Sequence, residues 1–367
     1  MLGIKQKTGR VFLLVLSFMI GGCRTSDTPM LSDNPAEVIC ELGSNKVELG
    51  QLLDAAIIND DTLVCISGNQ VIMYDGSGTQ VGLVGRRGRK TEEYIQPACV
   101  AGNSENILVW DGMSGRILIF DLSGEYLRSF ALDVPVADML PIGKLLYVYK
   151  MNGGEGGFID VLDMETGDRV TSIGNPSQAQ YVLTGWSSAA PLSRLGDSVY
   201  YMPKDRLVVY REEDAKSWEC ISKTFRAEQV QDSEALRANR AKMDKYLDEN
   251  SFIVSIAAQE DKCYILALEG YYLPGDNWAN KKEHRYYSIY EVNLENGHSR
   301  CMMHFPMGNM LPHLIMPGKN CFYYIGNEIK DMEESYSLMR ISIPRDHDSC
   351  RHYGHISYSE SSCSIQQ

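Results

Sequence analysis

The sequence predicts an all-β fold built from six four-stranded antiparallel sheets, and three observations support this prediction. Short apolar runs recur along nearly the whole chain. They come in pairs separated by a turn, which is the pattern of a β-hairpin. The core runs are continuous in apolar residues, whereas a sheet with one face in water would alternate apolar and polar residues. The clearest copy is the segment 105–127, ENILVWDGMSGRILIFDLSGEYL.

The paired runs define six modules. The pairs begin at Asp61, Glu105, Lys144, Ser198, Lys262 and Asn320. One more short run precedes each pair, at residues 52–58, 98–101, 137–142, 188–192, 252–257 and 311–316. Another run follows most pairs, for example at residues 126–130 and 169–173. Each module therefore has four predicted strands.

The modules are expected to stack around one axis. A lone hairpin is marginal in water, and these strands need cover on both faces, so the modules must pack on one another. Four-stranded modules at this spacing are typical of β-propeller blades. The sequence thus predicts a six-bladed β-propeller over residues 37–358, followed by a tail at 359–367. We expect the run 38–49, which precedes the first module, to pair with the sixth and close the ring.

A family resemblance supports the same fold. The segment 105–127 resembles an NHL-type repeat, and Gly85, Gly88, Glu93, Tyr94 and Pro97 are similar to the connector of that family. Lys90-Thr91-Glu92 stands where the family has Pro-Gly. As a whole, the chain resembles the TolB-like or NHL-like six-bladed propeller lipoproteins that are abundant in Bacteroidetes. This resemblance implies a protein of the bacterial envelope.

The N-terminus predicts the compartment. Lys5, Lys7 and Arg10 precede an apolar run at 11–20, which is typical of a signal peptide and too short for a stable membrane anchor. The following Gly-Gly-Cys resembles a bacterial lipobox, which implies cleavage after residue 22 and a lipid on Cys23. Arg24 rather than Asp follows that cysteine, so the resemblance implies the outer membrane, on its periplasmic or cell-surface face. Residues 23–36 are polar and are expected to form a tether.

The charge excludes one class of partner. The formal net charge of the whole chain is −13, and removal of residues 1–22, with their three basic side chains, would leave −16. Such an acidic surface repels phosphate backbones, so no nucleic-acid partner is expected.

Nine cysteines remain besides Cys23, and no Cys-x-x-Cys occurs. Cys65, Cys263 and Cys321 lie in apolar strand runs and are expected to be reduced core residues. Cys350 and Cys363 in the tail could pair.

One segment departs from the β pattern. Residues 227–250 are rich in Ala, Glu, Lys, Arg and Leu, and apolar side chains recur at helical spacing at Val230, Leu236, Met243, Tyr246 and Leu247. We expect an amphipathic helix that packs its apolar stripe on the ring. A helix that docks a partner is the alternative.

Candidate sites follow from the fold. Propeller enzymes usually work in the central channel, and Asp54, Asp138 and His313 are the ionisable residues expected there. A calcium or zinc site built from them would resemble the gluconolactonase-type hydrolases, although the Glu and Asn ligands of those enzymes have no match here. The simpler interpretation is that Asp54 and Asp138 cap strands at the channel mouth. No cofactor is expected otherwise.

Two loops are candidate binding surfaces. One carries Tyr271, Tyr272, Trp278, Tyr286 and Tyr287, and exposed aromatic side chains suit carbohydrate or protein contacts. The alternative is a hairpin whose tyrosines pack on the neighbouring blade. The other loop carries the basic residues Arg86, Arg87, Arg89 and Lys90 in an otherwise acidic protein, and it suits an anionic glycan or an acidic protein patch. Its alternative is a solvated connector between blades.

The sequence therefore predicts an envelope-anchored lipoprotein that binds a glycan, peptide or protein and has no catalysis of its own. The alternative is a metal-dependent hydrolase or lactonase that uses the channel.

Overall fold

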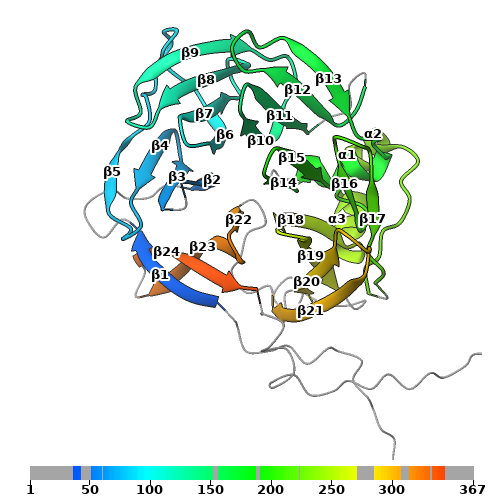
Figure 1. The fold of residues 1–367 in the computed structure, drawn as a ribbon. Helices are drawn as coiled ribbons and strands as arrows, with labels where there is room; N and C mark the ends of the chain where they lie inside the picture. The colour runs from blue at the N-terminus through cyan, green and yellow to red at the C-terminus, as the bar shows by residue number, and fades with distance from the viewer. Residues whose placement is uncertain are drawn as a thin grey trace, which may run out of the picture. The chain divides into compact units, whose positions relative to one another are not determined.

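Six antiparallel sheets of four strands each form a ring around a central axis (Figure 1). The computed structural model describes residues 36–42, 51–59, 61–151, 156–186, 191–222, 224–270, 285–306, 314–330 and 333–343, all of which belong to one structural unit, residues 31–367. Each sheet is one blade, and in blades 1 to 5 the strands follow the chain from the axis outwards. The predicted all-β, six-bladed fold is confirmed.

The first three blades have these strands. Blade 1 contains β2 (Leu52–Ile58), β3 (Thr62–Ser67), β4 (Gln70–Tyr74) and β5 (Gln80–Leu83). Blade 2 contains β6 (Pro97–Gly102), β7 (Asn106–Asp111), β8 (Arg116–Asp121) and β9 (Tyr126–Ala131). Blade 3 contains β10 (Val136–Ile142), β11 (Leu145–Lys150), β12 (Ile159–Asp163) and β13 (Arg169–Ile173).

The other three blades complete the ring. Blade 4 contains β14 (Leu192–Leu195), β15 (Ser198–Tyr201), β16 (Val208–Arg211) and β17 (Ser217–Glu219). Blade 5 contains β18 (Phe252–Gln259), β19 (Lys262–Gly270), β20 (Arg285–Asn293) and β21 (Ser299–Pro306). Blade 6 contains β22 (Ile315–Gly318), β23 (Cys321–Lys330), β24 (Glu333–Ser342) and β1 (Ala36–Leu42).

The first strand of the chain closes the ring. β1 is the outermost strand of blade 6 and pairs antiparallel with β24, with Ala36 opposite Ile341 and Leu42 opposite Tyr336. The side chains of Glu37 and Arg340 form an ion pair at 2.6 Å across the same ladder. At the axis, each innermost strand contacts the next, and β22 contacts β2. The predicted closure by the N-terminal run is confirmed, with the described strand ending at Leu42.

The core lies between neighbouring blades. Val64, Ile66, Leu118 and Phe120 are fully buried in one cluster between blades 1 and 2, and clusters of the same kind fill the other interfaces. Both faces of each blade are covered in this way, which is why the core runs of the sequence are continuously apolar. Cys65, Cys263 and Cys321 are buried reduced cysteines, as predicted, and Cys65 and Cys263 lie inside these clusters.

The helical insertion differs from the prediction in one respect. Two short helices, α2 (Ser233–Ala238) and α3 (Arg240–Glu249), replace the single expected helix. Asn239 separates them because its backbone is extended and its side chain accepts a hydrogen bond from the Lys242 N–H, which caps α3. The predicted apolar stripe packs on the core of blades 5 and 6. A third helix, α1 (Gln178–Trp186), precedes β14 and was not predicted.

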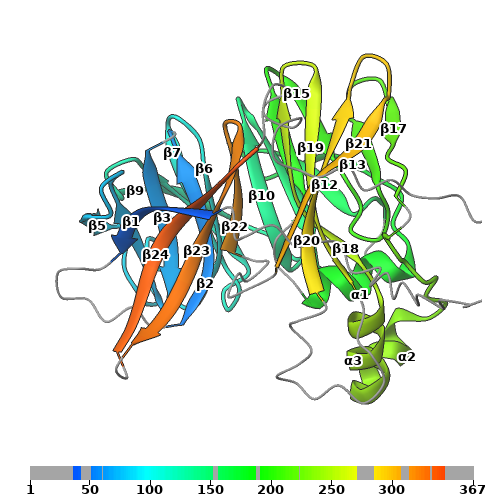
Figure 2. The same cartoon turned by 90° about the horizontal axis from the view of Figure 1, so that it is seen from below.

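The two faces of the ring have connections of very different length. On one face, which we call the short-turn face, all hairpin turns have five residues or fewer. The opposite face, which we call the long-connection face, receives the segments 84–96, 174–191, 220–251 and 271–284 between its strand ends. Figure 2 shows α1, α2 and α3 together at one end of the strands. Among the described residues, no helix has the length and hydropathy of a membrane span.

Candidate functional site

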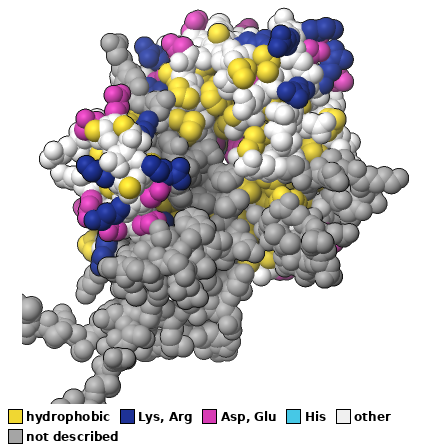
Figure 3. All heavy atoms as spheres, turned by 180° about the vertical axis from the view of Figure 1, so that it is seen from behind, with side chains coloured by type: hydrophobic (Ala, Val, Ile, Leu, Met, Phe, Trp, Pro, Cys, Tyr) yellow, Lys and Arg dark blue, Asp and Glu magenta, His cyan; other side chains and the backbone are white. Residues whose placement is uncertain are grey.

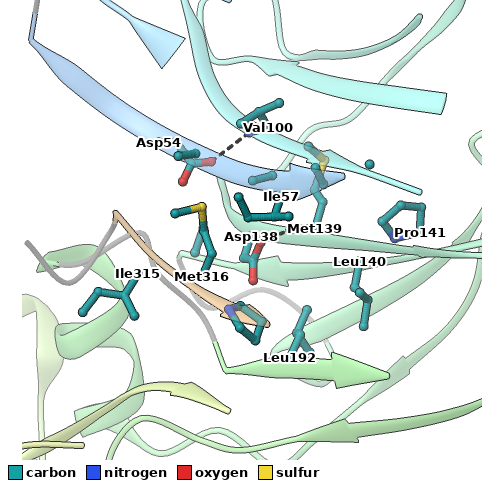
Figure 4. Close-up of a pocket in the computed structure, with 16 residues that line it drawn as sticks. Asp54, Ile57, Val100, Asp138, Met139, Leu140, Pro141, Leu192, Ile315 and Met316 are labelled. Carbon is teal, nitrogen blue, oxygen red and sulfur yellow. Dashed lines mark hydrogen bonds between the residues drawn. The ribbon is translucent and has the colours of Figure 1, made fainter. Parts of the chain in front are cut away.

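The central channel contains a cavity of about 130 Å³ (Figure 4). Its walls come from the innermost strands of five blades, β2, β6, β10, β14 and β22. Polar atoms make up about half of its wall surface, and the apolar residues that line it include Ala55, Ile57, Ala101, Met139, Leu140, Pro141, Leu192, Ile315, Met316 and Pro317. Asp54 and Asp138 are the ionisable side chains among the described lining residues. The structure thus brings these two predicted channel residues to one cavity.

A repeated backbone irregularity places the two carboxyl groups. β2 has a β-bulge between Leu52 and Asp54, and β10 has one between Val136 and Asp138. Bulges occur at the corresponding places in β6 and β18. A bulge adds one residue to a strand and redirects its side chains. Asp54 and Asp138 therefore occupy equivalent positions in blades 1 and 3.

Asp54 is a buried acid that bridges two blades. Its side chain is 8% exposed, and its Oδ2 accepts a hydrogen bond of 2.8 Å from the Val100 N–H on β6 (Figure 4). Burial raises the pKa of Asp54 from 3.8 to about 7, although the Val100 hydrogen bond opposes the shift. No ion pair to this carboxyl group occurs among the described residues. A substantial fraction of Asp54 is therefore protonated near neutral pH.

Asp138 has a cationic neighbour that the sequence analysis missed. Burial, followed by the charge of Asp54, raises the pKa of Asp138, while the charge of Lys204 lowers it. Lys204 is fully buried, and burial lowers its pKa to about 7. Lys204 follows a short strand in a Met-Pro-Lys sequence that resembles an ordinary turn, so no pattern marked it as functional.

The substitution Asp54→Asn is expected to make the free energy of unfolding of the propeller less dependent on pH. The folded-state pKa of Asp54 exceeds its unfolded value, so the wild type loses stability as pH rises from about 4 to 7, by as much as about 4 kcal/mol. Asp54→Asn should be the more stable protein above about pH 7 and should lose this part of the slope. Urea unfolding across this pH range measures the difference, with the exposed Glu105→Gln as control. Parallel pH profiles for wild type and Asp54→Asn would contradict the expectation.

A second candidate is the basic loop on the long-connection face, residues 85–90. The side chain of Glu93 fixes the conformation of this loop. Glu93 Oε1 accepts a hydrogen bond of 2.9 Å from Arg86 Nε, and Glu93 Oε2 accepts one of 3.0 Å from the Lys90 N–H. The Lys90 hydrogen bond, with the Arg86 charge, lowers the pKa of Glu93. Gly88 is required because a Cβ there would lie 1.8 Å from Glu93 Oε2. The glycine and glutamate of the connector thus form one structural unit.

Blade 2 fixes the other end of this connection. The Arg116 guanidinium on β8 donates hydrogen bonds of 3.1 Å to the carbonyl oxygens of Thr91 and Glu93. Asp111 accepts hydrogen bonds from the Ile95 and Gln96 N–H groups at 2.9 and 2.7 Å. These contacts explain why the segment has a defined conformation without regular secondary structure.

Arg87 and Arg89 have exposed side chains on this loop, and neither guanidinium has an ion-pair or hydrogen-bond partner among the described residues. Arg86 differs, because Glu93 and Glu92 neutralise it at 2.9 and 3.7 Å. Figure 3 views the ring from behind Figure 1, and on that face Lys and Arg side chains gather in groups. The loop can therefore offer two free positive charges to an anion.

The aromatic loop requires a correction. Tyr286 and Tyr287 are buried, with 9% and 0% exposure, so neither presents an aromatic surface to a partner. They begin β20, where Tyr287 packs on Phe305 with ring centroids 5.7 Å apart. Tyr287 also shares a buried cluster with Phe322 and Tyr324 of blade 6, so it packs on the neighbouring blade, which is the alternative given above. Tyr271, Tyr272, Trp278, His313 and Cys23 lie outside the described residues.

The described part of the chain holds no group of three or more His, Cys, Asp or Glu side chains arranged to bind a metal ion. Asp54 and Asp138 alone do not supply the six to eight oxygen ligands that calcium takes. The channel, as far as the structure describes it, contains a small pocket with two acids and a wall that is about half polar and half apolar.

A closed ring of six four-stranded blades defines the class of protein, a six-bladed β-propeller. The chain belongs to the DUF5128 family, described as "6-bladed beta-propeller", which matches residues 44–316. A search of the curated proteins found no match.

Two solved structures have the same fold. One is a protein from Bacteroides fragilis that is described as a "Putative exported protein". Its sequence is 14% identical, the TM-score is 0.58, and the match covers 87% of this chain and 98% of that chain. The other is a DUF4221 family member from Bacteroides vulgatus, with 12% identity, a TM-score of 0.59, and coverage of 83% and 97%. At sequence identities this low, the similarity to these two structures shows the fold alone.

Proposed function

We propose that this chain is an exported lipoprotein, anchored in the bacterial outer membrane through Cys23, that binds a protein or glycan partner on its long-connection face. One observation carries the binding role, namely the unequal lengths of the connections on the two faces. Turns of minimal length suffice to build the blades, so the longer segments add surface that the fold does not need. Binding residues concentrate on such loops when a rigid scaffold positions them.

The basic loop supplies the chemistry of this face. Arg87 and Arg89 belong to a protein whose net charge is −13, and their side chains are not neutralised by described neighbours. Two fixed guanidinium groups suit carboxylate, sulfate or phosphate groups on a partner. The rigid support from Glu93 and Arg116 lowers the entropy that binding would cost.

Export and lipidation rest on other grounds. The signal-like segment and Cys23 lie outside the described residues, and the resemblance of residues 20–23 to a lipobox supports the anchor. Likeness in fold to a Bacteroides protein described as exported agrees with this location. The alternative of a metal-dependent hydrolase or lactonase gains no complete ligand set from the described residues, so we propose binding as the function.

Charge reversal on the basic loop is expected to abolish partner capture. Arg87→Glu with Arg89→Glu should reduce recovery of the partner from solubilised outer membranes at least about tenfold, because loss of two charge contacts exceeds about 1.4 kcal/mol. Lys144→Glu with Arg169→Glu is the matched control. It makes the same charge change at two exposed residues on the short-turn face. Equal recovery with both double variants would refute the assignment of the binding face.

A further inference from the structure

The two acids of the channel cavity have different neighbours. Asp138 has a cationic neighbour: the charge of Lys204 lowers the pKa of Asp138 and the charge of Asp138 raises that of Lys204, although burial shifts both groups toward their neutral forms. Asp54 has no cationic partner among the described residues, although its carboxyl group faces the same cavity. The other titratable groups that interact with these acids are neutral, because burial raises the pKa of Cys65, Cys99 and Tyr149. One positive charge is therefore needed for Asp54 to ionise without penalty.

The size and lining of the cavity limit what can supply this charge. Its volume is about 130 Å³, and an apolar protein cavity of about 150 Å³ holds benzene, a molecule with six heavy atoms. About half of its wall surface is apolar, and the side chains of Ile57, Met139, Leu140, Ile315 and Met316 in that part favour a short hydrocarbon chain. A hydrated divalent ion would find too few oxygen ligands and much apolar surface.

We propose that this cavity binds the ammonium group of a small primary amine, with the Asp54 carboxylate as its counter-ion. The alkyl part of the ligand lies against the methionine and isoleucine side chains, and the ammonium group donates a hydrogen bond to Asp54 Oδ1. The Val100 N–H continues to hold Oδ2, so the carboxylate is positioned before the ligand arrives. This site is separate from the basic loop, and either assignment can fail while the other holds.

The proposal is tested with n-butylammonium chloride as the probe, added to the purified protein. At a concentration of ten times its Kd the probe should lower the unfolding equilibrium constant about 11-fold. 1-Butanol has the same number of heavy atoms and no charge, and it should have a much smaller effect at equal concentration. Sodium chloride controls for ionic strength.

Binding should depend on pH in one direction. Because the ligand displaces the proton of Asp54, its affinity should weaken about tenfold for each pH unit below about 7 and level off above it. Titration calorimetry at about pH 6, in buffers of different ionisation enthalpy, should show release of about one proton per amine bound.

Two variants and a control separate this site from general effects. Asp54→Asn should abolish the effect of the amine, whereas Asp138→Asn keeps the proposed counter-ion and should retain it. Glu105→Gln, which removes an exposed carboxylate elsewhere, should bind as the wild type does. Equal stabilisation by 1-butanol, unchanged binding in Asp54→Asn, or no binding up to about 10 mM at pH 8 would each overturn the proposal.

Discussion

A chain that begins at residue 43 is expected to lose the cooperative unfolding transition of the propeller. Without β1, β24 loses its outer ladder partner and the buried side chain of Leu42 is missing from the core. The lost hydrogen bonds and apolar contacts amount to about 5 kcal/mol or more, a large share of the 5–15 kcal/mol that stabilises most folded proteins. Thermal melting followed by circular dichroism measures the transition.

A chain that begins at residue 36 is the matched control, because it keeps β1 and lacks everything before it. It should melt as the full-length protein does. If the chain starting at residue 43 keeps the same transition as this control, then β1 is not what holds the ring closed.

Removal of the buried acid Asp160 is expected to destabilise blade 3 by about 3–5 kcal/mol. Lys150 Nζ lies 3.0 Å from Asp160 Oδ1, and the two side chains are 1% and 5% exposed. Ser172 Oγ also donates a hydrogen bond to Asp160. Asp160→Ala would leave the Lys150 ammonium group in the core without its counter-charge, which is far more costly than loss of the ion pair itself. Urea unfolding of wild type and variant gives the difference.

A double variant separates loss of the pair from an orphaned charge. Lys150→Met with Asp160→Leu replaces the ion pair by apolar side chains of similar size, and it should recover most of the stability that Asp160→Ala loses. A double variant as unstable as the single one would contradict this account and would point to packing as the cause.

The fold was predictable because the pattern that determines it, a pair of apolar runs separated by a turn, is local and recurs along the chain. Runs such as Ile117 to Phe120 are apolar at every position, and they recur with turns at nearly constant spacing, so the strands, their number and their stacking could be derived together. The ring closure was predictable because one run was left without a module. α1 escaped prediction because it is only nine residues long and its cap was not recognised: the Ser177 Oγ accepts a hydrogen bond of 3.0 Å from the Gln180 N–H. The break at Asn239 was missed because it depends on a side-chain cap.

The candidate site was less predictable. Asp54 and Asp138 could be placed in the channel because they lie on innermost strands, where topology decides position. Lys204 could not, because it lies beyond a strand end and reaches Asp138 only through the tertiary fold. Tyr286 and Tyr287 stand where the predicted second run of the fifth module meets its loop, and the structure places both in β20 and buries them. Sequence patterns identify strands reliably and identify their ends poorly.

The ring closure also determines the order of folding. Glu37 and Arg340, which face each other across the closing ladder, are 303 positions apart in the chain. Contacts of such long range form late, because the intervening chain must first be ordered. We therefore expect β1, which is synthesised before the other strands of the propeller, to take its place last. Until then its edge and that of β24 are open, and two incomplete molecules could exchange their first strands.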